Sequence, residues 1–181
     1  MRLLVLTLAL LASPLAAQTL TFDVGASGMG RAEGPFTFIS LADGAVVPAA
    51  DSASTAWDLA FRGTTVLVNG GASGPGEGAA LLVESPFEAV TVVPEANLLA
   101  DGDRDCPRGE PLAVCTGSGN GWYLYAGNGV EPLPERTLVV RTADGDGLVK
   151  LRFVSYTLQD EQPDGSRPRT YVVEVAPLST D

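Results

Sequence analysis

The sequence predicts an all-β fold, and three observations support this prediction. Glycine and proline, at 21 and 13 of 181 residues, interrupt the chain every few positions. After residue 17, no window keeps the i, i+3, i+4 apolar spacing of an amphipathic helix. Short β-branched or alternating runs occur instead, separated by Asn-Gly and Asp-Gly dipeptides that form tight turns. We therefore expect antiparallel hairpins and meanders with long loops, and little or no helix.

Ten segments have this strand pattern. They cover residues 18–24, 35–41, 55–61, 64–69, 79–83, 87–93, 122–126, 137–142, 148–158 and 170–176. The run 137–142 turns through Asp144-Gly145 into 148–158, and 170–176 is expected to continue this meander as a third strand. Along 148–158, alternation places Lys150 and Arg152 away from the core, toward solvent.

A second hairpin is predicted around Gly63. Period-two alternation divides its first strand into two faces, one with Trp57, Leu59 and Phe61 and the other with Asp58, Ala60 and Arg62. One of these faces is expected to be core. Gly63 then reverses the chain into 64–69, because glycine adopts the backbone angles of a tight turn.

The first residues have the pattern of a secretory signal peptide. Arg2 gives a positive start, residues 3–12 are apolar except for Thr7, and small residues precede an expected cleavage after Ala17. No later apolar run has the length of a membrane span, and no cysteine lies at the cleavage point for a lipid anchor. We expect a single exported domain, residues 18–181, that is periplasmic, on the cell surface or extracellular.

Composition excludes several classes of function. The chain has no histidine, which excludes Ser-His-Asp and Cys-His catalysis and histidine-ligated zinc or heme. Its formal charge is −11 and Lys150 is its one lysine, so clustered cations for a nucleic-acid backbone are missing. We expect no nucleic-acid partner.

The two cysteines are expected to form a disulfide. Cys106 and Cys115 have eight residues between them, and an exported protein folds in an oxidising compartment. Just before them, Asp101, Asp103 and Asp105 have the every-second-residue spacing of a calcium loop. The rest of that motif is missing, because the sixth position is Cys106 and the twelfth is Leu112, so we expect a solvated turn there and no calcium site.

The segment 69–78 contains five glycines in ten positions, and its backbone amides are one candidate for an anion site. It has no basic residue, and Glu77 opposes an anion. Ser73 is not a nucleophile elbow, since Pro75 stands where that motif needs glycine. We expect a mobile surface loop between two strands.

A short aromatic strand, 122–126, lies between two glycine-rich turns. Alternation places Trp122 and Leu124 on one side, and Tyr123 and Tyr125 on the other. Either side can enter the core while the other lines a cleft, and packing alone is the common explanation of such a strand.

Taken together, several segments resemble the HmuY family of bacterial heme-binding proteins. They are 57–65 running into Val68-Asn69-Gly70-Gly71, the glycine-rich stretch up to 80, Trp122-Tyr123, 138–145, Lys150-Leu151-Arg152 to Tyr156, and 171–175. The resemblance covers most of the chain after the expected signal. It implies an all-β, hand-shaped hemophore-like protein that captures heme and passes it to an outer-membrane receptor.

The resemblance does not transfer the iron ligands. Characterised hemophores of that family hold iron with a pair of histidines or, in some relatives, methionines, whereas this chain has no histidine and only Met29 besides Met1. The axial candidates that remain are Met29, Tyr123, Tyr125, Tyr156, Tyr171 and Lys150. Tyrosinate, a hard anionic ligand for ferric iron, is the chemically sensible one, and the strand 122–125 is the first place to look.

Three hypotheses follow, of which we favour the first. The chain is a non-enzymatic module that binds heme or another flat apolar molecule by shape and aromatic contacts. Alternatively, it is a cell-envelope structural or interaction module that kept the fold and lost heme binding, with Tyr123 and Tyr125 packed into a filled cleft. A third, an acidic-pair hydrolase, requires two carboxylates facing each other across a groove.

Overall fold

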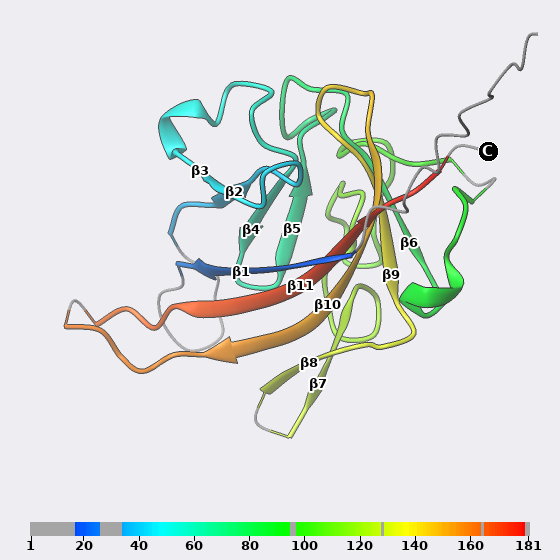
Figure 1. Ribbon diagram of the computed structural model, residues 1–181. Helices are drawn as coiled ribbons and strands as arrows, with labels where there is room; N and C mark the ends of the chain where they lie inside the picture. Colours follow the sequence, from blue (N-terminus) through cyan, green and yellow to red (C-terminus); the bar gives the residue numbers. More distant parts are fainter. Residues whose placement is uncertain (1–16, 26–33, 95–96, 128, 164, 180–181) are drawn as a thin grey trace, which may run out of the picture.

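The computed structural model describes residues 17–25, 34–94, 97–127, 129–163 and 165–179. In these ranges the chain forms antiparallel sheets (Figure 1), so the predicted all-β fold is confirmed. The larger sheet has the order β1 (Gln18–Val24), β11 (Arg169–Pro177), β10 (Leu148–Leu158), β9 (Thr137–Arg141) and β6 (Ala79–Val83). The smaller sheet has the order β3 (Val46–Val47), β2 (Thr37–Ile39), β4 (Leu59–Arg62) and β5 (Thr65–Val68). A separate hairpin joins β7 (Tyr123–Ala126) to β8 (Gly129–Pro132).

Both predicted hairpin arrangements are present. Strands β4 and β5 pair around Gly63, which has a positive φ of 55°, and β9, β10 and β11 form the expected meander. Strands β10 and β11 run together past the rest of the sheet, while the hairpin β7–β8 projects below (Figure 1). No helix in the described ranges is long and apolar enough to cross a membrane.

One predicted strand, 87–93, is wrong. The chain there forms a short 3-10 helix, η2 (Phe87–Ala89), followed by an isolated bridge at Val92. The carbonyl oxygens of Phe87 and Val90 accept hydrogen bonds from the ammonium of Lys150, at 2.7 Å and 2.8 Å. These contacts with a distant cation favour a turn against β10 over an extended strand.

The same contacts correct the prediction for the outer face of β10. Lys150 and Arg152 point away from the core as expected, but η2 covers them and they are only partly exposed. Both cations lie over the ring of Phe87, at 4.4 Å and 5.1 Å from its centre. Arg152 also pairs with Glu88 of η2 at 2.7 Å and with Glu174 of β11 at 2.6 Å, so this face stabilises η2 against the sheet.

The main core cluster lies between the two sheets, and a smaller separate cluster contains Val90, Val139 and Leu178. The main cluster includes residues from both sheets, such as Phe22, Phe61, Leu151 and Val173. Strand β4 is buried on both faces, because Ala60 is as fully buried as Phe61. The expectation of a single core face for this strand is therefore wrong.

Strand β10 contains a β-bulge that alternation does not reveal. Phe153 is opposite Val173 and Ser155 is opposite Val172, so Val154 is an extra residue. After the bulge, Tyr156 is opposite Tyr171. The extra residue reverses the pleat and places Tyr156 on the same face as Phe153, whereas strict alternation would place Ser155 there.

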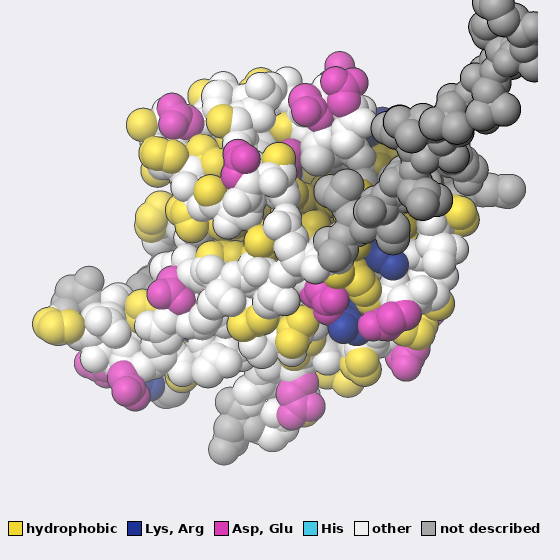
Figure 2. Space-filling view, in the orientation of Figure 1, with side chains coloured by type: hydrophobic (Ala, Val, Ile, Leu, Met, Phe, Trp, Pro, Cys, Tyr) yellow, Lys and Arg dark blue, Asp and Glu magenta, His cyan; other side chains and the backbone are white. Residues whose placement is uncertain are grey.

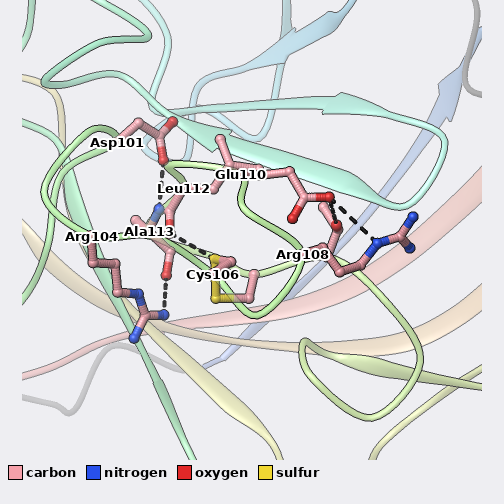
Figure 3. Close-up of a disulfide and its surroundings, with 9 residues drawn as sticks. Asp101, Arg104, Cys106, Arg108, Glu110, Leu112 and Ala113 are labelled. Atoms are coloured by element: carbon pink, nitrogen blue, oxygen red, sulfur yellow. Dashed lines mark hydrogen bonds and ion pairs between the residues drawn. A yellow bond between two sulfur atoms is a disulfide. The ribbon is translucent and has the colours of Figure 1, made fainter.

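The disulfide between Cys106 and Cys115 is confirmed, with their Cα atoms 5.4 Å apart (Figure 3). Beside it, the Arg104 guanidinium donates to the carbonyl oxygen of Ala113 at 2.7 Å, and the Asp101 carboxylate accepts from the amide of Ala113 at 2.7 Å. The disulfide thus closes the loop, and the Asp101 carboxylate attaches it to the smaller sheet, because this carboxylate also accepts from the amide of Val68 in β5 at 3.1 Å.

The glycine-rich segment is a surface loop between β5 and β6, as expected, but its two ends are buried and held by hydrogen bonds. The buried side chain of Asn69 accepts from the amide of Gly76 at 3.1 Å and donates to the carbonyl oxygen of Trp57 at 2.7 Å. A Cβ atom on Gly70 would lie 2.0 Å from the carbonyl oxygen of Gly78. Glycine is needed here because two backbone segments come into direct contact.

Candidate ligand site at the tyrosine cluster

All four tyrosines of the chain gather around one tryptophan. The ring of Trp122 lies 4.9 Å from Tyr123, 5.6 Å from Tyr171 and 5.8 Å from Tyr156, measured between ring centres. Tyr125 continues the cluster, with its ring 5.3 Å from that of Tyr123. We call these four tyrosines and Trp122 the tyrosine cluster. It extends from the core to the protein surface.

The turn between β4 and β5 holds the buried part of this cluster. The Trp122 indole nitrogen donates to the carbonyl oxygen of Thr64 at 3.1 Å, and the Tyr171 hydroxyl donates to the carbonyl oxygen of Gly63. The Thr64 hydroxyl donates to the Tyr123 hydroxyl oxygen at 3.0 Å. Two adjacent residues of this turn, Gly63 and Thr64, thus form hydrogen bonds with polar groups of three aromatic side chains, as buried polar groups require.

Tyr123 is a core residue and not a ligand-facing one. Its side chain is 2% exposed, and its hydroxyl oxygen also accepts from the amide of Gly117 at 3.2 Å. A phenol oxygen that accepts two hydrogen bonds retains only its own proton for a further contact. The second hypothesis expected both Tyr123 and Tyr125 to be packed into a filled cleft. Tyr123 is packed in this way, whereas Tyr125 is exposed.

Tyr125 is the exposed member of the cluster. Its residue surface is 62% exposed, and its ring stands edge-on to Tyr123. Its backbone amide donates to the Ser118 hydroxyl at 2.8 Å, which fixes the strand that carries it. Partial burial and the neighbouring Tyr123 raise the pKa of the Tyr125 phenol, while the Arg108 guanidinium acts in the opposite direction.

Tyr156 lies at the boundary between core and surface. Its ring stands edge-on to Tyr171 at 4.9 Å, and it is partly exposed. Burial raises the pKa of the Tyr156 phenol, against the opposing effect of the Arg169 guanidinium. The next residue on the same face is Leu158, which is 48% exposed although apolar. Tyr125, Tyr156 and Leu158 therefore offer aromatic and apolar surface to a ligand.

Two other candidates have structural roles and one lies outside the described residues. Tyr171 is fully buried, and this burial raises the pKa of its phenol well above the ordinary value. Lys150 is occupied by two backbone carbonyl oxygens. Met29 falls in the range 26–33, of which the structure describes nothing. Among the described candidates, Tyr125 and Tyr156 remain accessible.

The buried carboxylates bind backbone amides. Asp101 is almost fully buried and accepts from the amides of Val68 at 3.1 Å and Ala113 at 2.7 Å. Asp58 likewise accepts from Leu41 at 2.7 Å and Ala143 at 2.8 Å. Burial raises the pKa of both carboxyl groups, and the amide hydrogen bonds oppose that rise. Asp101 is thus not part of the solvated turn that the sequence led us to expect.

No group of three or more histidine, cysteine, aspartate or glutamate side chains in the described ranges is arranged to hold a metal ion. Asp103 instead accepts from the backbone amide of Ala100 at 2.8 Å, as a turn residue does.

Sequence reasoning missed the residues that surround the tyrosines. Thr64, Arg108 and Arg169 are single residues far apart in the chain, and no local motif connects them with 122–126. Only Gly63 was a usable signal, because it located the turn that carries Thr64. Comparison with known proteins adds no relationship, since no family model and no curated protein matches the chain.

Proposed function

We propose that this chain is an exported, non-enzymatic protein that binds heme or another flat apolar molecule at the tyrosine cluster, as the likeness to the HmuY family implies. The main support is the position of Tyr125, whose exposed ring continues a buried stack of aromatic side chains. A flat ligand placed against such a ring gains contact area with little loss of side-chain freedom, since tyrosine has only two rotatable bonds.

The donor set fits ligation of heme iron from one side only. Among the described side chains, Tyr125 is the most exposed phenol, and the chain has no histidine. Bound heme would supply a ferric iron for which a phenolate oxygen is a suitable axial ligand. Tyr123 supports this use, because the hydrogen bonds from Thr64 and Gly117 leave its hydroxyl proton available for donation to a neighbouring oxygen.

A titration of purified protein with hemin, and in parallel with metal-free protoporphyrin, tests this proposal. The Soret band of hemin should shift and saturate at micromolar protein. Tyr125→Phe keeps the ring and removes the phenol oxygen, so it should alter the hemin spectrum and leave protoporphyrin binding nearly unchanged. Tyr125→Ala should weaken both. An unshifted hemin spectrum together with no protoporphyrin binding would exclude the proposal.

The second candidate is an interaction module of the cell envelope that has the fold and no ligand. The burial of Tyr123 favours it, because the side of this strand that was expected to line a cleft is partly filled. It predicts that neither hemin nor protoporphyrin binds. Transfer of ligand to an outer-membrane receptor belongs to the first proposal alone and requires that binding be seen.

A further inference from the structure

The charges beside the tyrosine cluster differ in sign from those of the whole protein. The chain has 22 acidic and 11 basic residues, and acidic side chains outnumber basic ones on the face drawn in Figure 2. In contrast, two arginines lie beside the cluster: Arg169 is opposite Leu158 in the pairing of β10 with β11, and Arg108 packs on Gly117, whose amide donates to the Tyr123 hydroxyl. A local positive field in an acidic protein attracts anionic groups to that place.

Arg169 lies on the ligand-facing side of the long strands. It is the first residue of β11 and pairs with Leu158 of β10. Because it is two residues from Tyr171, it shares the face that carries Tyr171 and Tyr156. Its guanidinium donates to the backbone carbonyl oxygen of Arg167. Among the residues that the structure describes, no carboxylate forms an ion pair with Arg169.

Arg108 approaches the cluster from the disulfide loop. Its side chain packs on Gly117, where an added Cβ would lie 3.0 Å from its Cδ atom. The amide of Gly117 in turn donates to the Tyr123 hydroxyl. Within the described part of the chain, Arg108 forms an ion pair with Glu110 alone, at 3.6 Å, and the Arg108 side chain is 61% exposed. Such a long, solvated pair contributes little and is readily exchanged for another anion.

From these positions we propose that the ligand is an aromatic acid: a flat apolar body that contacts Tyr125 and Tyr156 and carries at least one carboxylate, bound by Arg108 or Arg169. This inference rests on the proposed binding at the tyrosine cluster and specifies the chemical class of the ligand. Guanidinium groups suit this task because they bind carboxylates with two parallel hydrogen bonds. A carboxylated tetrapyrrole and a smaller aromatic acid share this chemistry.

Two matched pairs of probes test the inference. Protoporphyrin is compared with its neutral dimethyl ester, and 2-naphthoate with 2-naphthamide, at the same ionic strength. The acid of at least one pair should bind about tenfold more tightly than its neutral partner, with an advantage that falls as salt is added. The pair that shows the difference distinguishes a tetrapyrrole from a smaller aromatic acid.

Charge-removing variants locate the effect. At least one of the variants Arg108→Gln and Arg169→Gln should reduce the affinity for the acid by about fivefold and leave the neutral probe unchanged. Arg141→Gln is the matched control, because Arg141 is opposite Leu148, at the other end of β10 from Leu158. Circular dichroism of each variant confirms that it is folded.

The outcomes separate this inference from the proposed function. If acid and neutral probes bind equally and Tyr125→Ala weakens both, the cluster is a binding site but the ligand is not selected as an acid. If no probe binds, both proposals are wrong. Equal effects of Arg141→Gln and the two site variants would also overturn the assignment of Arg108 and Arg169.

Discussion

The indole nitrogen of Trp122 donates a hydrogen bond to the carbonyl oxygen of Thr64, 3.1 Å away and 58 residues earlier in the chain. This contact joins the hairpin β7–β8 to the turn of the smaller sheet. In the same turn, the carbonyl oxygen of Gly63 accepts a hydrogen bond from the Tyr171 hydroxyl, and the Thr64 hydroxyl donates one to the Tyr123 hydroxyl oxygen. The geometry of the proposed site therefore depends on a turn that is itself not expected to touch the ligand.

The hydroxyl of Thr64 should contribute more to the free energy of unfolding than the hydroxyl of an exposed threonine. Thr64→Val keeps the size of the side chain and the carbonyl oxygen that Trp122 uses, but it removes the hydrogen bond to Tyr123. We expect a loss of about 0.5–1.5 kcal/mol in the free energy of unfolding, measured with urea. Thr157→Val, at an exposed position of β10, is the control and should change it by less than about 0.5 kcal/mol. Equal effects would contradict the role given to this turn.

The register after the bulge at Val154 should be essential for the site. Deleting Val154 alone leaves Ser155 opposite Val172 and Tyr156 opposite Tyr171, so this variant should remain folded and bind the ligand. Deleting both Val154 and Ser155 moves Tyr156 opposite Val172 and turns it toward the outer face, away from Tyr171. We expect the double deletion to lose several kcal/mol in stability and to lose ligand binding, because an aromatic side chain leaves the cluster. A double deletion with wild-type stability would show that the register is not fixed.

The glycine-rich loop should not tolerate a methyl group at its contact points. In Gly70→Ala, the new Cβ would meet the carbonyl oxygen of Gly78 at 2.0 Å, so the backbone must move. We expect a destabilisation of about 1–3 kcal/mol by thermal or urea unfolding. Gly129→Ala is the matched control, since no atom lies within 4 Å of its Cβ position. A tolerated Gly70→Ala would indicate the mobile loop that the sequence alone predicted.

Asp58 should make the protein relatively more stable at low pH. Burial raises its pKa in the folded state above the ordinary value of 3.8, against the amide hydrogen bonds of Ala143 and Leu41. The folded state therefore binds the proton more tightly than the unfolded chain. The resulting stability is fully present below pH 3.8 and is lost as the pH rises through the raised folded-state pKa.

The variant Asp58→Asn does not titrate and isolates this effect. Urea unfolding of both proteins between about pH 7 and about pH 4 should show the wild type gaining stability relative to the variant as the pH falls. A relative loss of wild-type stability on acidification would mean that the folded-state pKa of Asp58 is lowered.

Most of the strands were predictable because alternation and turn dipeptides are local signals. The bounds of β1, β6 and β10 agree with the predicted segments. The segment 87–93 was not predictable, since the carbonyl oxygens of Phe87 and Val90 accept hydrogen bonds from Lys150, which is 63 and 60 residues later in the chain. Such a contact leaves no trace in the local pattern of hydrophobic residues.

The site was predictable only in part, for the same physical reason. The aromatic strand and the importance of Tyr125 and Tyr156 could be inferred from residue type. Alternation could not show that Tyr123 faces the core while Tyr125, on the same side of the strand, reaches solvent. Tyr123 contacts the turn at Thr64 and the backbone of Gly117, whereas the hairpin β7–β8 projects away from the sheets (Figure 1), and this placement is a tertiary property.

The chain's four tyrosines make one measurement especially direct. A spectrum of protein labelled with carbon-13 at tyrosine rings contains four sets of signals, assigned by single Tyr→Phe variants. On addition of metal-free protoporphyrin, we predict the largest shifts at Tyr125 and Tyr156, and smaller ones at the fully buried Tyr171. Unchanged signals for Tyr125 and Tyr156 in a sample that binds the porphyrin would show that the ligand lies elsewhere and would contradict the proposed site.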